Sequence, residues 1–325
     1  MNAALTALLF AAVPQHQTAS TIVAPSSASE QAKDAADYVC DGVDDQVELL
    51  ASITCAGRFS VDFDRSPYVM RPAECYGRHS VDWLPGDYHL GDTLTIPDTA
   101  DFVIRAEGTF FHYEPSTGDA VLIMGLTRCR FGFGTIETTS TGAALRIRPE
   151  SAMPSLTSVV GFTGLIGHDQ RGTGFHIDSA VENVCCNRFE GTDIYHFDTG
   201  VDLSEPAAND GTGYGCADSN WSWFNYIRRC RTGVREGRGA AVNVWEMNVD
   251  AGLTDSVAVR TGGRSGRWGI VAGAQPLEGT ARVLVLDPGA EGNMIDLQPT
   301  PKDGWVEDNS GNDTNIIRTT RRTTT

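Results

Sequence analysis

Three stretches of the sequence start with asparagine and place chemically active side chains at every second position. They are NRFEGTDI from Asn187, NWSWFNYI from Asn220 and NVWEMNVD from Asn243. The second and fourth positions after each asparagine are mostly apolar. This alternation predicts strands that turn those positions inward and the first, third and fifth positions outward. The outward positions hold Arg188 and Trp221 (first), Glu190, Trp223 and Glu246 (third), and Thr192, Asn225 and Asn248 (fifth).

These outward side chains suit a saccharide ligand. Trp221 and Trp223 offer flat faces to the apolar C–H patches of sugar rings, while the arginine, carboxylates and amides beside them can bond hydroxyl groups. We therefore expect a saccharide-binding face here. The alternative is that one or both tryptophans pack under the glycine-rich loop at 205–220 or in a contact between subunits, as large aromatic residues often do at interfaces.

The same face offers a pair of carboxylates. If the three stretches stack as neighbouring strands, Glu190 and Glu246 lie two strands apart, about 9.6 Å between backbones. Carboxylates about 6.5 to 9.5 Å apart suit an inverting glycoside hydrolase, which admits a water molecule between its acid and its base. Trp223 occupies the strand between them, however, where the reacting sugar would have to sit. We favour the competing interpretation, a solvated acidic face.

A second outward column consists of His176, Asp202 and Arg235 on glycine-led strands. Asp202 could orient His176 for acid–base catalysis. A cross-strand ladder of salt bridges is the more common outcome for such a column, and we favour it. A polysaccharide lyase would need a basic residue to take a proton. The chain has only two lysines, Lys33 and Lys302, and no arginine stands in a motif of a lyase family.

An internal repeat provides the elements that position these residues. Strand-like segments start at Gly118, Gly142, Gly174, Gly200, Gly233, Ser256, Arg282 and Trp305. Successive starts are 23 to 33 residues apart, and no helical pattern lies within the repeat. This period excludes helical repeats and also propeller blades, which need about 40 residues each. It predicts a β-solenoid in which the asparagine-led stretches form a second strand of each coil.

The recurring asparagines have a structural explanation in such a solenoid. Residues at equal positions stack on the next coil at about 4.8 Å. Asn187, Asn220, Asn243 and Asn293 are therefore expected to form a ladder of amides that bond to one another along the axis, as stacked asparagine does in cross-β arrays. We expect this ladder to be structural and not catalytic.

The N-terminal part of the chain differs from the repeat. An apolar run from Ala3 to Val13 has the length of a signal-peptide core, but no basic residue precedes it. Ser27 and Glu30 have the spacing of a capping box and predict a short helix. A second helix is expected after Asp44 or Asp45, either of which can cap it.

These signals divide the chain into four parts. The expected boundaries are an apolar segment at 1–25, signal-like or packed, a cap with short helices at 26–60, a parallel β-helix at 61–318, and a disordered tail at 319–325.

Two further stretches carry a family resemblance. ADYVCDGVDDQVELLASI followed by VDWLPGDYHLGDTLTI resembles the N-terminal cap and first coil of the pectin lyase-like right-handed parallel β-helix superfamily. GWVEDNSGNDTNII is similar to the closing coil of its viral and surface members. That superfamily includes polysaccharide lyases, glycoside hydrolases, viral tail and tailspike proteins and adhesins. The resemblance implies an all-β fold, a single right-handed parallel β-helix with a short N-terminal helical cap, and a glycan-oriented function without a particular activity.

Charge and composition narrow the partners. The 325 residues carry a formal net charge of -17, so the chain lacks the basic surface that binds nucleic acid, and an anionic membrane surface would repel it. No apolar run approaches the roughly 20 residues of an integral membrane segment. The eight cysteines show no CxxC spacing, so we expect neither a metal nor a cofactor. The acidic, lysine-poor composition fits a halophilic source or a GC-rich genome.

These observations predict a glycan-facing surface or virion-associated protein, tail- or spike-like. It would bind a polysaccharide or cell-surface glycan, be located outside the cell, at its surface or on a virion, and assemble as an oligomer such as a homotrimer. A polysaccharide-degrading enzyme using the same face, an inverting glycoside hydrolase or a lyase, is the alternative. A purely structural spike is the third. A carboxylate pair with open space between its members would favour the enzyme.

Overall fold

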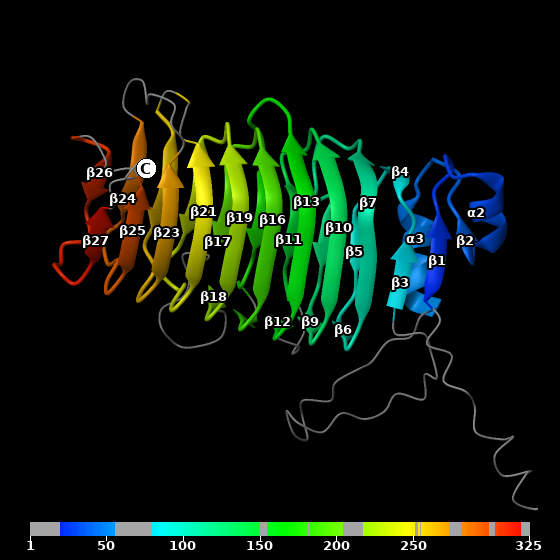
Figure 1. Ribbon diagram of the computed structural model, residues 1–325, viewed down its shortest axis with the longest axis horizontal. Coiled ribbons are helices and arrows are strands. Elements are labelled where there is room, and N and C mark those ends of the chain that lie inside the picture. The colour runs from blue at the N-terminus through cyan, green and yellow to red at the C-terminus, as the bar shows by residue number, and fades with distance from the viewer. Residues whose placement is uncertain are drawn as a thin grey trace, which may run out of the picture.

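The chain forms an elongated β-solenoid whose coils stack along one axis, with two short helices at its N-terminal end (Figure 1). The computed structural model describes residues 20–55, 80–149, 155–180, 182–203, 217–250, 253, 255–272, 281–298 and 303–319. Within them every strand pairing is parallel. The expected fold class, an all-β parallel β-helix with a short helical cap, is confirmed.

The described strands form three sheets, one on each side of the coil. The 13-stranded sheet runs in the order β2 (Tyr38–Val39), β1 (Thr21–Ala24), β3 (Ser80–Trp83), β7 (Val103–Tyr113), β10 (Arg130–Thr138), β13 (Val159–Gly167), β16 (Arg188–Tyr195), β19 (Trp221–Arg228), β21 (Val244–Asp250), β23 (Arg267–Ala272), β25 (Met294–Gln298) and β27 (Ile316–Thr319), with β4 (Gly86–Leu90) paired to β7.

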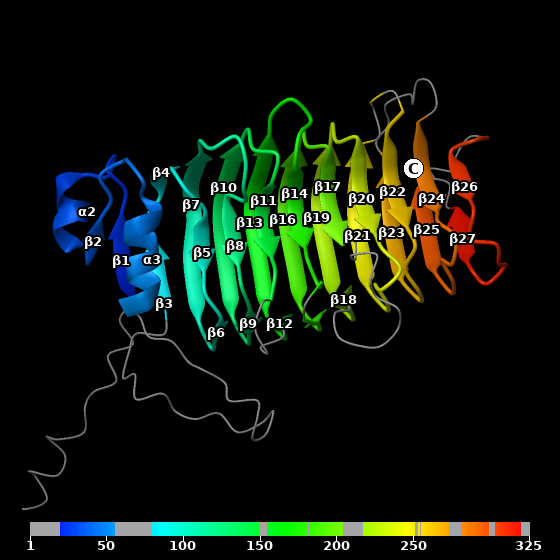
Figure 2. The same cartoon turned by 180° about the vertical axis from the view of Figure 1, so that it is seen from behind.

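The 9-stranded sheet faces the opposite side (Figure 2) and runs in the order β26 (Val306–Asp308), β24 (Arg282–Leu286), β22 (Val257–Thr261), β20 (Thr232–Glu236), β17 (Thr199–Leu203), β14 (Thr173–Ile177), β11 (Ala143–Ile147), β8 (Val121–Ile123) and β5 (Leu94–Ile96). The 5-stranded sheet contains β18 (Ala217–Asp218), β15 (Val184–Cys185), β12 (Ser155–Leu156), β9 (Leu126–Thr127) and β6 (Thr99–Ala100).

The repeat in the sequence corresponds to the 9-stranded sheet. Each of the eight predicted repeat segments, from Gly118 to Trp305, contributes one strand, and these strands are consecutive neighbours from β8 to β26. The asparagine-led stretches form β16, β19 and β21, which are neighbours in the 13-stranded sheet. The repeat period in the sequence therefore predicted correctly which segments form successive coils of the solenoid.

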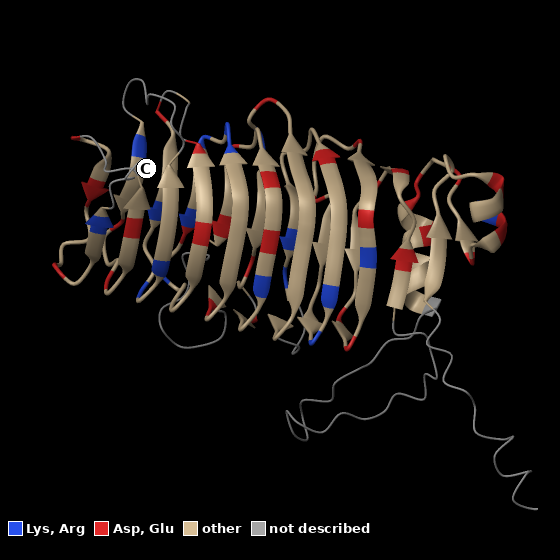
Figure 3. Cartoon of the chain, viewed as in Figure 1, with Lys and Arg blue, Asp and Glu red and all other residues tan. Residues whose placement is uncertain are grey.

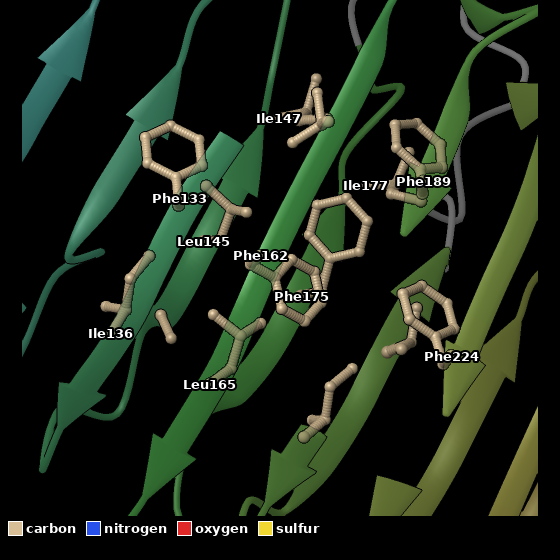
Figure 4. Close-up of a cluster of buried hydrophobic side chains, with 14 of the residues drawn as sticks. Phe133, Ile136, Leu145, Ile147, Phe162, Leu165, Phe175, Ile177, Phe189 and Phe224 are labelled. Carbon is tan, nitrogen blue, oxygen red and sulfur yellow. The ribbon is translucent and has the colours of Figure 1, made fainter. Parts of the chain in front are cut away.

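Inward-facing aromatic side chains fill the space between the sheets. Phe162 stacks on Phe224 with ring centroids 6.0 Å apart, and Phe175 meets Phe224 edge-on at 6.4 Å (Figure 4). Towards the C-terminus, Trp245 and Trp268 stack at 5.2 Å with an interplanar angle of 10°. Such close packing holds the strand register, and with it the outer face, in one arrangement.

The predicted asparagine ladder is confirmed for three members. Asn187 Nδ2 donates to Asn220 Oδ1 at 3.3 Å, and Asn220 Nδ2 donates to Asn243 Oδ1 at 3.2 Å. Each of these acceptors also accepts the backbone N–H of the asparagine one coil earlier, at 3.1 and 3.0 Å. All three residues are buried. The ladder thus satisfies polar groups at the corner between the 5-stranded and 13-stranded sheets.

The fourth expected member, Asn293, does not adjoin the other three. Gly266 takes the ladder position on the intervening coil, and Asn293 accepts its backbone N–H at 2.9 Å. A Cβ at Gly266 would lie 2.8 Å from Trp268 Nε1, so the buried indole leaves no room for a side chain there. The expectation of one continuous ladder was wrong, and Asn293 instead donates to Asn315 Oδ1 at 3.0 Å.

The first cap helix, α2, is Glu30–Ala35 and is capped differently from the prediction. Ser29 is its N-cap and accepts the backbone N–H of Ala32 at 3.3 Å. Ser27 lies before the cap, so the predicted capping box between Ser27 and Glu30 does not form. A serine two residues closer to the helix satisfies the free amide groups of its first turn.

The second cap helix, α3, is Gln46–Cys55 and starts directly after Asp45. The Asp45 carboxylate accepts the backbone N–H groups of Gly42 and His89, each at 2.8 Å. It therefore ties the loop before α3 to β4 instead of capping the helix. This contact fixes the cap on the first coil.

The strand β1 (Thr21–Ala24) lies inside the segment expected at 1–25. It pairs with β2 and β3, so the folded cap starts within that segment. The apolar run predicted to be signal-like lies outside the described residues. Of the tail expected at 319–325, Thr319 is described and ends β27, so that boundary was wrong by one residue, and the rest lies outside the described residues.

Candidate functional site

The outer face of the 13-stranded sheet carries the predicted site residues in one column. Glu190 on β16 is the register partner of Trp223 on β19, and Trp223 is the partner of Glu246 on β21. Arg188 is likewise the partner of Trp221. The third positions of the three asparagine-led stretches therefore lie side by side, as their alignment predicted.

Both tryptophans face solvent. Trp221 is 52% exposed and Trp223 45%, whereas Ser222 and Phe224 are buried. A slip of one residue would have reversed this pattern, so the predicted inward and outward positions of β19 are confirmed. Two exposed indole rings two residues apart on one strand form an unusually apolar patch for a surface, which is typical of a binding site.

Glu190 already has a partner. The Arg188 guanidinium forms an ion pair with the Glu190 carboxylate, and Arg188 Cζ lies 5.6 Å from the ring centroid of Trp221. Trp223 stands between Glu190 and Glu246 in the register. These two carboxylates thus lack the open space that an acid–base pair needs.

A bulge alters the fifth position of the column. The register of β19 and β21 shifts between Phe224 and Ile227, so β19 has one residue more than its neighbour. Asn225 and Asn248 are half-buried, and the neighbouring Tyr226 is 56% exposed. Sequence reasoning missed Tyr226 because it assumed uninterrupted alternation, and nothing in NWSWFNYI marks an extra residue.

A groove of about 250 Å³ starts at Trp223 and crosses the next three strands. Its polar lining residues are Glu246, Asn248, Asp296 and Gln298, and Gly269 also lines it. Sequence reasoning missed Asp296 and Gln298, although the signal was present. NMIDLQ from Asn293 repeats the asparagine-led pattern and puts them at its third and fifth positions.

Glu246 and Asp296 flank a gap in the column. Gly269 on β23 is the register partner of both, so two strand spacings separate the carboxylates and no side chain stands between them. Among the described residues, neither carboxylate makes an ion pair or a side-chain hydrogen bond. Many other outward carboxylates do pair with an arginine. Examples are Asp82, Glu190, Asp193 and Asp287.

The second predicted column forms a structural ladder. His176, Asp202 and Arg235 are register neighbours on β14, β17 and β20. Both Asp202 oxygens accept from the Arg235 guanidinium, one of them from Nε at 3.1 Å. Asp202 is buried and does not face solvent as expected, because it lies against this guanidinium. Burial lowers the pKa of His176, with Arg146 acting in the same direction and Asp202 against it.

Three potential metal ligands meet in the cap, away from the groove. Donor atoms of Cys40, Asp45 and Glu48 lie within 4.8 Å of one another. Burial raises the pKa of the Cys40 thiol, and the charges of Asp45 and Glu48 act in the same direction. A metal would need the thiolate. Both oxygens of Asp45 also accept backbone N–H groups, so this cluster is explained by the structure of the cap.

The geometry of this face carries the functional argument alone. Among the described residues, no helix has the length and apolar character needed to cross a membrane. No protein family, curated protein or solved structure matches the chain.

Proposed function

We propose that the outer face of the 13-stranded sheet binds a saccharide, and that the chain is a glycan-facing surface or virion-associated protein. The observation that carries the proposal is the exposure of Trp221 and Trp223 beside a groove lined by carboxylates and amides. An indole ring packs against the C–H face of a sugar. Asn248, Gln298 and Glu246 can exchange hydrogen bonds with the sugar hydroxyls.

The charge of the groove favours neutral sugars or amino sugars over uronic acids. Among the described residues that line it, none is lysine or arginine, whereas Glu246 and Asp296 are carboxylates without partners. The chain as a whole has a formal net charge of -17. A polyuronate would bring its own carboxylates against this field, while an ammonium group would be attracted. The same charge argues against a lyase, which acts on uronates.

The test is binding of the intact chain to a defined panel of polysaccharides. The panel contains laminarin, xylan, mannan and partly deacetylated chitin, with polygalacturonate as the polyanionic comparator. We expect binding to at least one of the first four and none to polygalacturonate. Trp223→Ala is expected to weaken binding by at least about 10-fold, because central aromatic residues dominate such contacts, and to leave the melting midpoint nearly unchanged.

Three results would count against the proposal. Preferred binding of polygalacturonate would show that the negative charge of the groove does not select against uronic acids. A Trp223→Ala variant that binds every polysaccharide as the parent does would show that the tryptophan is not the platform. Loss of self-association in the same variant, measured by analytical ultracentrifugation, would instead assign this face to contacts between copies of the chain. The chain would then be a purely structural spike without a saccharide ligand.

A further inference from the structure

We infer that the groove also hydrolyses a glycosidic bond, with Glu246 and Asp296 as its acid–base pair; this inference rests on the proposed saccharide binding. The two carboxylates lie on either side of Gly269, on β21 and β25. They have no partner among the described residues. This is the arrangement that Glu190 and Glu246 lack, since an indole stands between those two.

The separation of the pair suits an inverting hydrolase. Two strand spacings place the backbones of Glu246 and Asp296 about 9.6 Å apart. Glu246 leans into the gap, because its Cγ lies 3.7 Å from the position that a Cβ on Gly269 would take. The Glu246 side chain therefore extends towards β23, the strand between the two carboxylates. Inverting enzymes hold their carboxyl groups about 6.5 to 9.5 Å apart to admit a water molecule.

The surroundings of the pair provide subsites for a sugar chain that runs along the solenoid axis. Trp223 adjoins Glu246 on one side and can stack one ring. The next glycosidic bond would then lie over Gly269, where no side chain obstructs it. Asn248 and Gln298 line the same groove and can bond ring hydroxyls. The aromatic platform and the carboxylate pair are therefore parts of one site.

The reaction needs only water as its second reactant. One carboxylate takes a proton from a water molecule whose oxygen attacks the anomeric carbon from the face opposite the leaving group. The C–O bond to the leaving sugar breaks, and the other carboxyl group donates its proton to the departing oxygen. One water is consumed, the products are an inverted hemiacetal and a new hydroxyl end, and the two carboxyl groups exchange protons with solvent to restart the cycle.

The first test measures new reducing ends from the polysaccharides that the intact chain binds. Glu246→Gln and Asp296→Asn are each expected to lower the rate by about 100-fold or more while binding persists, because general acid or base catalysis contributes about 10² to 10⁴. Glu107→Gln is the matched control. Glu107 is an exposed carboxylate on β7 of the same sheet, far from the groove, and its loss should leave the rate unchanged. Proton NMR of the first product should show inverted configuration.

The second test fills the gap without removing a carboxylate. A Cβ on Gly269 would find its nearest atoms at 3.6 and 3.7 Å, and one on Gly161 at 3.8 and 4.0 Å, so both positions accept a side chain. Gly161 adjoins Glu190 in the same column, on the other side of Trp223. Gly269→Val should abolish hydrolysis with the fold intact, whereas Gly161→Val should retain hydrolysis. This comparison also serves if a carboxylate variant fails to fold.

The outcomes separate this inference from the proposed binding. If the intact chain binds a polysaccharide but releases no reducing ends, hydrolysis is overturned and binding stands. Unsaturated products, retained configuration, or full activity in Gly269→Val would also overturn it. If no polysaccharide of the panel binds, the proposed function and the hydrolysis that rests on it both fail.

Discussion

The buried corner before β16, β19 and β21 and the outer face of these strands differ in how their polar side chains are bonded. On the inner side, Asn187, Asn220 and Asn243 are buried, and their amide groups bond along the axis. On the outer side, Trp223 and Glu246 are exposed, and Glu246 has no bonding partner among the described residues. Satisfied buried groups stabilise a fold, whereas unsatisfied exposed groups remain available to a ligand.

A similar contrast runs along the outer face itself. Charged residues of both signs are distributed over the 13-stranded sheet (Figure 3). Around β16 they are paired, as in Arg188 with Glu190 and Arg228 with Asp193. On β21 and β25, Glu246 and Asp296 have no such partner within the part of the chain that the structure describes. The groove therefore lies on the part of the sheet where these carboxylates have no arginine partner.

Two tryptophans on adjacent strands give the largest expected difference between the faces. Trp245 is 1% exposed and stacks on Trp268, whereas Trp223 is 45% exposed. Trp245→Ala should lower the free energy of unfolding by about 3 to 5 kcal/mol, the usual effect of removing a buried aromatic side chain. Trp223→Ala should lower it by less than about 1 kcal/mol. Urea unfolding of the two variants checks this, and similar losses would mean that both indoles serve packing.

The asparagine ladder predicts the next largest effect. Removing the Asn220 amide leaves the backbone N–H and side chain of Asn187 and the carbonyl of Val184 without their bonds. Asn220→Ala should therefore lower the free energy of unfolding by about 1 to 3 kcal/mol. Asn225→Ala, in β19 directly after this corner, is the control and should change it by less than about 0.5 kcal/mol. An unchanged urea midpoint in Asn220→Ala would show that the ladder does not contribute to stability.

A smaller, pH-dependent effect is expected from a buried carboxyl group beside the ladder. Glu236 accepts from Asn243 Nδ2 at 3.1 Å, Trp245 Nε1 at 3.2 Å and Thr261 Oγ1 at 2.6 Å. Burial raises its pKa, against the lowering effect of these three hydrogen bonds. The folded state therefore favours the protonated carboxyl group.

The sign of this effect follows from the raised pKa. Stability from Glu236 is fully present below the carboxyl's ordinary pKa of about 4.3 and is lost as pH rises through the higher folded value. Glu236→Gln keeps a neutral group, so the variant should gain stability over the parent as pH rises. Urea midpoints of both proteins between pH 4 and pH 8 measure this difference. A constant difference would show that Glu236 does not titrate in this range.

The sequence predicted the fold and half of the site for the same physical reason. Period-two alternation and the repeat determine which residues stack. The coil order, the three-membered ladder and the outward tryptophans could therefore all be predicted from the sequence. The position of Asp296 could also have been predicted, because Asn293 starts a fourth copy of the pattern. The ladder break at Gly266 could not be predicted, because it depends on the packing of the buried Trp268 indole. The bulge that exposes Tyr226 could not be predicted either, because it is a register shift between two strands.

The smallest expected effect comes from the backbone corner that turns each ladder residue inward. The residue before each ladder position has a left-handed backbone, as in Cys186, Ser219 and Val242, with φ of 59°, 52° and 56°. Val242 is β-branched and 55% exposed, so it bears the strain of this conformation without burying its side chain. The left-handed conformation costs most residues about 1 to 2 kcal/mol, and asparagine tolerates it better.

Val242→Asn should therefore raise the free energy of unfolding by about 0.5 to 1 kcal/mol, part of the strain being retained. Val43→Asn is the control, because Val43 is 68% exposed and does not have a positive φ. It should bring no gain. Urea unfolding at neutral pH compares both variants with the parent, and saccharide binding should be unchanged in each, since neither residue lines the groove. A gain confined to Val242→Asn would assign the strain to the left-handed backbone at the corner. Equal effects of the two substitutions would mean that replacing an exposed valine by asparagine, and not the backbone conformation, causes any change.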